Sequence, residues 1–209
     1  SDKADLVIEF KNNKIITELK DKNKGADYGQ KELIWDHEKF WSWSLGKTNK
    51  EDKTVKLFKS LKIIENHIDK EFIPRKYSKK KTNQKKVKSV YEDVTVEDYR
   101  YDLKHMEKDN IPIPLDTLFK YYEFKNCFYI QIEKSGFYHL KKDKFNLGTQ
   151  QFDGEICLRT RAKFRKSKKD ILKTPWEYGL LAKIRLKKKP KPSKFDIEEL
   201  DGREFPFKD

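Results

Sequence analysis

The chain has 209 residues, of which 40% are charged and only 35% hydrophobic, and its formal net charge is +14. This length allows one domain with a sizeable core, or one domain with an appendage, and the 14 Phe and 10 Tyr can fill a core from few positions. So large a surplus of Lys and Arg favours a polyanionic partner, most often nucleic acid. A compositional bias toward Lys, Asn and Ile, as AT-rich genomes encode, would raise the charge in the same way.

Cysteine and histidine usage excludes two classes of protein. Cys127 and Cys157 are too few for a disulfide scaffold, and each lies in an apolar strand-like run, so we expect buried thiols. The four histidines are scattered, and none has a zinc-like spacing to a cysteine. There is no apolar run long enough to span a membrane and no recognisable signal peptide, so we expect a soluble cytoplasmic protein with no membrane partner.

Residues 5–20 alternate like two short strands joined by a tight turn. With Asn12 and Asn13 as the central turn residues, Asp5 pairs with Lys20 and Val7 with Glu18. Asp5, Glu18 and Lys20 then gather at the open end of the hairpin, on one face. The opposite face is nearly all apolar, and consists of Leu6, Ile8, Phe10, Ile15, Thr17 and Leu19.

The next elements read as helices followed by a basic loop. The apolar segment from about 27 to 43 predicts a helix that ends near Gly46. Within 49–72, apolar residues recur at helical spacing and predict a second helix. The stretch 74–90 holds eight basic residues and no acidic residue, and is typical of a surface loop or linker.

Strands dominate the second half of the sequence. Residues 91–105 fit either a strand or a helix, and a short helix should follow the prolines at 112 and 114. A hairpin is predicted around Ser135-Gly136, and two long strands after it, within 155–166 and 178–189. The tail from Pro190 onward is rich in proline and charge, and should be loose.

The two long strands each predict one packed face and one basic face, because strand side chains alternate. Their exposed arginines favour phosphate or guanine contacts, since only Arg offers a planar fork, although a basic sheet face that contacts only solvent has the same pattern. The basic loop allows the same two interpretations, direct DNA contact or a solubilising segment. The candidate DNA-binding residues are Arg75, Lys79, Lys80, Lys81, Lys85, Lys86, Arg159, Arg161, Lys163, Arg165, Lys183 and Arg185.

The cluster at the open end of the hairpin has the residue types of a metal-dependent hydrolase. Two neighbouring carboxylates repel each other, so a proton, a cation or a metal must compensate. Hard ions such as Mg²⁺ prefer carboxylate oxygens and leave room for water and a substrate phosphate. A lysine beside them can neutralise that phosphate or orient a water, which is the chemistry of metal-assisted phosphodiester cleavage. The alternative is a solvated strand face with a surface salt bridge.

The dipeptide Ala4-Asp5 followed by Glu18-Leu19-Lys20 after a short hairpin resembles the active site of the PD-(D/E)XK nuclease superfamily, which includes many type II restriction endonucleases. The resemblance covers about residues 1–45, and Ala4 stands where the motif has Pro. It implies that Asp5, Glu18 and Lys20 are catalytic. It also implies that Asp5, Glu18 and the main-chain carbonyl of Leu19 bind Mg²⁺, with Mn²⁺ as a substitute.

The resemblance also implies a fold. We expect an α/β (α+β) protein with a mixed β-sheet flanked by helices, a restriction-endonuclease-like core and a strand-rich basic C-terminal part. In chain order this gives a catalytic core (1–73), a basic loop or linker (74–90), a strand-rich DNA-binding part of the same domain (91–189) and a loose tail (190–209). The helix after the second strand would be residues 27–43. The family normally places a helix and a strand before the first Asp, so those elements come from residues before Ser1 or from elsewhere.

By the same resemblance, the expected activity is Mg²⁺-dependent hydrolysis of phosphodiester bonds in double-stranded DNA, by a sequence-specific type II restriction enzyme. Such enzymes usually act as dimers with one active site per strand, so a homodimer is expected. Two alternatives remain open at this point. One is a non-catalytic nucleic-acid-binding protein, and the other is a structure-directed nuclease of repair or recombination.

Overall fold

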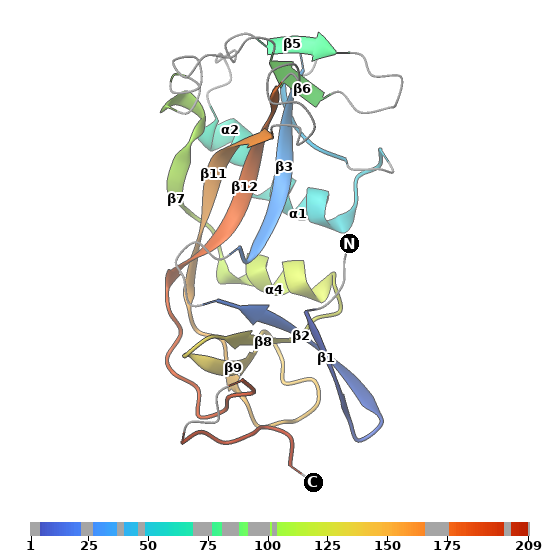
Figure 1. The fold of residues 1–209 in the computed structure, drawn as a ribbon, viewed down its shortest axis with the longest axis vertical. Coiled ribbons are helices and arrows are strands. Elements are labelled where there is room, and N and C mark those ends of the chain that lie inside the picture. Colours follow the sequence, from blue (N-terminus) through green and yellow to red (C-terminus); the bar gives the residue numbers. More distant parts are fainter. Residues whose placement is uncertain are drawn as a thin grey trace. The chain divides into compact units, whose positions relative to one another are not determined.

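The fold is mixed α+β, with two β-sheets and few helices in the part of the chain that the structure describes (Figure 1). This agrees with the expected α+β class. The structure is a computed structural model, and it describes residues 5–21, 27–36, 40–45, 49–68, 77–80, 88–91, 101, 104–165, 176–198 and 202–208.

The chain divides into two compact units, and each is assembled from segments that are far apart in sequence. The sequence-based division had instead followed consecutive segments, so its boundaries do not coincide with these units. The first unit contains residues 1–29, 112–157 and 184–209, and the second contains residues 30–111 and 158–183.

The first unit is built on a five-stranded mixed sheet in the order β1-β2-β8-β9-β10. Within it β1 and β2 are antiparallel, β2 and β8 are parallel, and β8 and β9 are antiparallel. The predicted hairpin around Ser135-Gly136 is therefore confirmed as β8 and β9. The strands are β1 (Leu6–Phe10), β2 (Asn13–Lys20), β8 (Tyr129–Ile132), β9 (Gly136–His139) and β10 (Gln150–Gln151).

Helix α4 (Leu115–Glu123) covers one face of this sheet, and the helix predicted after the two prolines is confirmed. Pro114 precedes its first turn in extended conformation, where the missing N–H does no harm. Parallel strands need a crossover connection, commonly a helix, and α4 directly precedes β8 beside β2 (Figure 1). Its buried residues are Thr117, Leu118, Phe119, Tyr121 and Tyr122.

The other face of the sheet is covered by the C-terminal segment, which corrects the prediction of a loose tail. Phe195 is 3% exposed and joins a core cluster with Ile15, Tyr129 and Phe137. The ring of Phe207 lies 5.4 Å from that of Phe10 at the hairpin. Composition indicated a polar, proline-rich tail, but burying these few large aromatic rings outweighs the ordering of the segment around them.

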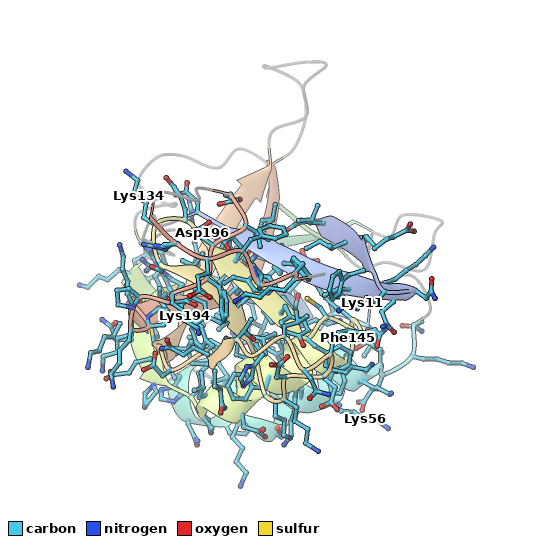
Figure 2. All side chains as sticks on the ribbon, turned by 90° about the horizontal axis from the view of Figure 1, so that it is seen from below. Lys11, Lys56, Lys134, Phe145, Lys194 and Asp196 are labelled. Carbon is cyan, nitrogen blue, oxygen red and sulfur yellow. The ribbon has the colours of Figure 1, made fainter. Side chains whose placement is uncertain are left out.

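The register of the β1–β2 hairpin also differs from the prediction. Leu6 pairs with Thr17 and Ile8 with Ile15, so the turn is one residue earlier. Its central residues are Lys11 and Asn12, with φ of 44° and 63°, and Figure 2 labels Lys11 at this end of the hairpin. Each residue of β1 thus pairs two positions earlier along β2 than expected. A shift by two keeps every side chain on its predicted face, because strand side chains alternate.

Most residues of a seven-stranded sheet belong to the second unit, although β11 begins and β12 ends in residues of the first. In this sheet β4-β3-β12-β11-β7 is the main order, and β6 pairs with β5 and β12. The two predicted long strands are confirmed as the neighbours β11 and β12. The strands are β3 (Gly29–Asp36), β4 (Phe40–Trp43), β5 (Tyr77–Lys80), β6 (Lys88–Tyr91), β7 (Lys108–Pro112), β11 (Glu155–Arg165) and β12 (Trp176–Lys188).

The helix predicted at 27–43 is wrong, because β3 and β4 form an antiparallel pair there. The buried rings of Trp41 and Trp43 are two residues apart, which is strand spacing and not helix spacing. The helix predicted within 49–72 is present in two pieces, α1 (Lys53–Ser60) and α2 (Ile63–His67). Lys62, at φ 52°, adopts the left-handed conformation and interrupts them.

The basic loop predicted at 74–90 is partly strand, because β5 and β6 pair antiparallel within it. Residues 74–76 and 81–87 of that loop lie outside the described residues, as do 92–100 and 102–103 from the segment that fitted either element. The end of that segment, at 104–106, is helical.

Two smaller expectations concern thiols and membranes. Cys127 and Cys157 are both buried free cysteines, as predicted. Within the described ranges, no helix combines the length and the apolar character needed to cross a membrane.

Candidate active site

Glu18 and Lys20 lie on the same face of β2, two residues apart, because strand side chains alternate. The Lys20 ammonium donates a hydrogen bond to Glu18 Oε1. Both side chains are largely buried, at 11% exposure for Glu18 and 13% for Lys20. The pair is therefore not the solvated surface salt bridge that was the simplest alternative, and its interaction is less screened than that of an exposed pair.

Asp5 lies at the start of β1, beside the same end of β2. The observed register, extended by one residue from Leu6 and Thr17, places Asp5 opposite Glu18. Asp5 Oδ2 accepts a hydrogen bond of 3.1 Å from the main-chain N–H of Leu19. The corrected register thus brings the two carboxylates opposite each other, whereas the predicted one had paired Asp5 with Lys20.

The Leu19 carbonyl shares this edge of β2. The N–H and C=O of one strand residue point to the same neighbouring strand, and the N–H of Leu19 points to Asp5. Its carbonyl oxygen therefore faces the side of β2 on which Asp5 lies. This places the three predicted sources of ligand oxygen, Asp5, Glu18 and Leu19, around one strand end.

Tyr122 of α4 reaches the same carboxylate from above the sheet. Its hydroxyl donates to Glu18 Oε1 at 3.4 Å, and the side chain is fully buried. Burial against the sheet, together with the neighbouring Glu18 charge, raises the pKa of the Tyr122 hydroxyl well above its usual value. The hydroxyl therefore stays protonated and acts as a donor to the carboxylate.

Cys127 and Tyr28 complete the surroundings of the pair. The Cys127 thiol lies 3.5 Å from the carbonyl oxygen of Ile16 on β2, and burial with the Glu18 charge raises its pKa to about 12. The Lys20 ammonium lies 6.0 Å from the centre of the Tyr28 ring. Burial also raises the pKa of Tyr28, so Tyr122, Cys127 and Tyr28 are all neutral beside the charged pair.

The chemistry of this donor set fits a hard divalent cation. Two carboxylates and a main-chain carbonyl are the oxygen ligands that Mg²⁺ takes, with the remaining positions left to water and substrate. Among the described residues, no three His, Cys, Asp or Glu side chains gather at one point. A cation at this strand end would therefore depend on Asp5, Glu18 and the Leu19 carbonyl, with solvent.

The candidate DNA-contacting residues are placed differently. On β11, Arg161 is exposed, whereas Arg159 is half-buried and pairs with Glu107 at 3.5 Å. On β12, Lys183 and Arg185 are half-buried. Lys79 and Lys80 lie on β5, and Lys163 and Arg165 on β11, without described side chains, while Arg75, Lys81, Lys85 and Lys86 lie outside the described residues.

The division into units separates the two predicted sets. Asp5, Glu18 and Lys20 belong to the first unit. Arg185 belongs to the first unit as well, and the other described candidates for DNA contact belong to the second: Lys79, Lys80, Arg159, Arg161, Lys163, Arg165 and Lys183.

Tyr122 was missed by the sequence-based reasoning. The helix that carries it was predicted, but the strand that it would cover was not, because β2 and β8 are far apart in sequence. A signal was present all the same. Tyr122 follows Leu118 at helical spacing on the apolar side of α4, and a tyrosine buried in this way usually finds a hydrogen-bond partner for its hydroxyl.

Comparison with known proteins adds no relative. No protein-family model matches the chain, and neither a curated protein nor a solved structure matches it.

Proposed function

We propose that the chain is a Mg²⁺-dependent endonuclease that hydrolyses phosphodiester bonds of double-stranded DNA, with the sequence specificity of a type II restriction enzyme. The observation that carries this proposal is the convergence at the end of β2. There Asp5 lies opposite Glu18, the Leu19 carbonyl shares their edge, and Lys20 bonds Glu18. These are the positions that resemble the PD-(D/E)XK signature, and they hold the expected residue types together in space.

Each residue has a distinct role in the proposed reaction. Asp5, Glu18 and the Leu19 carbonyl would hold the cation, which when bound would polarise the scissile phosphate and activate a water. The hydrogen bond from the Leu19 N–H fixes Oδ2 of Asp5, so that Oδ1 would be the oxygen offered to the cation. The Lys20 ammonium neutralises negative charge that develops on the phosphate oxygens as the P–O bond breaks.

The surroundings of the strand end support this proposal. A mixed sheet with α4 on one face belongs to the α+β class that the resemblance implies. The net charge of +14 favours a polyanionic substrate. A homodimer, with one active site for each DNA strand, remains part of the proposal on the resemblance alone, and sedimentation equilibrium with and without DNA tests it.

Incubation with plasmid DNA tests the proposed activity. The chain is mixed with supercoiled plasmid in Mg²⁺, and in parallel in Mn²⁺ and in EDTA. Discrete fragments that form in either metal and not in EDTA support a sequence-specific nuclease, while a smear indicates a nonspecific or structure-directed one. A plasmid that stays intact in both metals, at protein concentrations that retard it on a gel, contradicts the nuclease and indicates a binding protein.

Burial of the Glu18–Lys20 pair favours a second candidate, a nucleic-acid-binding protein without catalytic activity. Side chains exposed to only 11% and 13% are also typical of an ion pair that serves the fold. Such a protein would bind DNA equally well in EDTA and in Mg²⁺. Its affinity would fall steeply with salt, because lysines and arginines on phosphates release condensed counterions.

A further inference from the structure

Glu18 makes two hydrogen bonds to other side chains, and both reach the same oxygen. The Lys20 ammonium and the Tyr122 hydroxyl each donate to Oε1. Among the described residues, no hydrogen bond to Oε2 is present. The carboxylate is therefore fixed through one oxygen, while its second oxygen keeps its lone pairs for another partner.

This one-sided arrangement depends on α4. A glutamate has three rotatable side-chain bonds, and an unrestrained one loses considerable rotamer entropy when it is fixed on a ligand. Lys20 alone is a poor restraint, because it lies on a long flexible stem of the same strand. Tyr122 is a rigid aromatic side chain, fully buried on a helix that packs across the sheet, and its hydroxyl reaches Glu18 from outside the strand.

We propose that Tyr122 is a positioning residue for Glu18, which holds the carboxylate through Oε1 so that Oε2 is presented to a divalent cation at the end of β2. This inference rests on the proposed function, since it assigns Tyr122 to the same metal site. Tyr122 touches neither the cation nor the substrate. Donors that orient a metal-ligating side chain typically contribute about 10–100-fold to metal affinity, and the long 3.4 Å bond suggests the lower end of that range.

The test removes one hydroxyl and measures metal binding without catalysis. Mn²⁺ is titrated into wild type and into Tyr122→Phe, and the free ion is followed by electron paramagnetic resonance. We expect Tyr122→Phe to weaken Mn²⁺ binding about tenfold, and plasmid cleavage to be restored at higher Mn²⁺ concentration. A merely structural hydroxyl would lower the melting temperature of the metal-free chain and leave the Mn²⁺ affinity unchanged.

Tyr129→Phe is the matched control. It removes another tyrosine hydroxyl in the first unit, one that bonds Asp143 at 2.5 Å on the opposite face of the sheet. It should reduce stability without changing Mn²⁺ affinity. A double variant with Glu18→Gln adds a second criterion, because loss of the Tyr122 hydroxyl should then have no further effect on Mn²⁺ binding.

The outcomes separate the two proposals. Wild type that binds no Mn²⁺ and cuts no DNA overturns the proposed function and this inference with it. If wild type and Tyr122→Phe bind Mn²⁺ equally tightly, the inference is overturned and the proposed function stands. The same conclusion follows if Tyr122→Phe and Tyr129→Phe weaken Mn²⁺ binding by equal amounts.

Discussion

Two buried carboxylates in the first unit, Glu18 and Asp196, are engaged in contrasting ways. Asp196 is 1% exposed, and both of its oxygens accept hydrogen bonds. Oδ1 accepts from Gln131 Nε2 at 3.0 Å and from the Glu198 N–H at 2.8 Å, and Oδ2 accepts from Arg203 at 3.0 Å. Figure 2 labels Asp196 on the C-terminal segment, which these bonds attach to the β8–β9 hairpin.

Glu18 is nearly as buried, but the hydrogen bonds from Lys20 and Tyr122 both end on its Oε1. A fully satisfied carboxylate stabilises a fold and offers nothing to a ligand. One that is held at a single oxygen, beside a second carboxylate and at a strand end, has the features of a binding site. We therefore assign Asp196 to the fold and Glu18 to the proposed site, and the predictions below test that contrast.

The largest effect should come from the acids of the proposed site. Asp5→Asn and Glu18→Gln should each lower plasmid cleavage by at least about a thousandfold, because losing a metal ligand removes several kcal/mol of transition-state stabilisation. DNA affinity should be kept or improved, since a negative charge near the phosphate is lost. Both quantities come from cleavage rates and from fluorescence anisotropy with a labelled duplex.

Glu9→Gln is the control for these two variants. Glu9 lies on the same hairpin and is exposed, where it pairs with Lys14 at 3.5 Å. Its removal should leave cleavage near the wild-type rate. If Asp5→Asn also cuts at that rate, the assignment of the site to this strand end is wrong.

The second prediction is that Asp196→Ala disrupts the fold. It leaves Gln131 and Arg203 without their buried acceptor, and breaking a buried ion pair typically costs about 3–5 kcal/mol. Because the Arg203 side chain is 26% exposed, we expect about 3 kcal/mol, the lower end of that range. Urea unfolding measures it.

Glu204→Ala is the matched acid on the same segment. Its carboxylate pairs with the exposed Lys208 at 3.3 Å, and such pairs contribute about 0–1 kcal/mol. Equal destabilisation by Asp196→Ala and Glu204→Ala would remove the contrast that we draw between the two buried carboxylates.

The contrast also shows which parts of the molecule a sequence can predict. Alternation and turn residues predicted the two faces of the first hairpin, the β8–β9 hairpin and the two long strands β11 and β12, because each of these depends on local pattern. The residues at the proposed site were found in the same way. Their surroundings were not found, since Tyr122 reaches Glu18 only through the parallel pairing of β2 with β8.

The failures have equally physical causes. The segment from 27 to 43 is apolar enough for a helix or a buried strand, and the periodicity of so short a run does not separate the two. The C-terminal tail was judged by its prolines and charges. Asp196 and Phe195 become buried only because the rest of the first unit supplies Gln131 and the aromatic cluster as partners.

The third prediction uses Cys127 to sense the Glu18 cluster. Burial and the Glu18 charge raise the pKa of its thiol to about 12, whereas an unfolded thiol has a pKa near 8.5. The stability that comes from keeping the thiol neutral is thus fully present below about pH 8.5, the pKa of the unfolded thiol, and is lost as the pH rises toward 12. Between pH 8 and pH 10 we expect a loss of about 2 kcal/mol from this group.

Urea unfolding at the two pH values, in wild type and in Cys127→Ala, isolates that contribution. The variant loses packing at both pH values, so only the difference in pH dependence is informative. A smaller loss is expected in Glu18→Gln, which lacks the neighbouring charge. Identical pH dependence in wild type and Cys127→Ala would show that the thiol does not sense its burial or the carboxylate beside it.

The smallest effect concerns the hairpin register that brings Asp5 opposite Glu18. The turn residues Lys11 and Asn12 have positive φ, as a type I′ turn requires, and glycine adopts that conformation most easily. Asn12→Gly should therefore stabilise the chain by about 0.5 kcal/mol.

Asn13 lies in β2, and its side chain donates to the Lys11 carbonyl at 3.1 Å. Asn13→Gly should destabilise by about 0.5–1 kcal/mol, because glycine weakens a strand and this bond is lost. If Asn13 were instead the second central turn residue, both substitutions would stabilise, and Asp5 would face Lys20. Thermal unfolding of the two variants therefore distinguishes the two registers, and only the one with Lys11 and Asn12 in the turn sets the two carboxylates of the proposed site against each other.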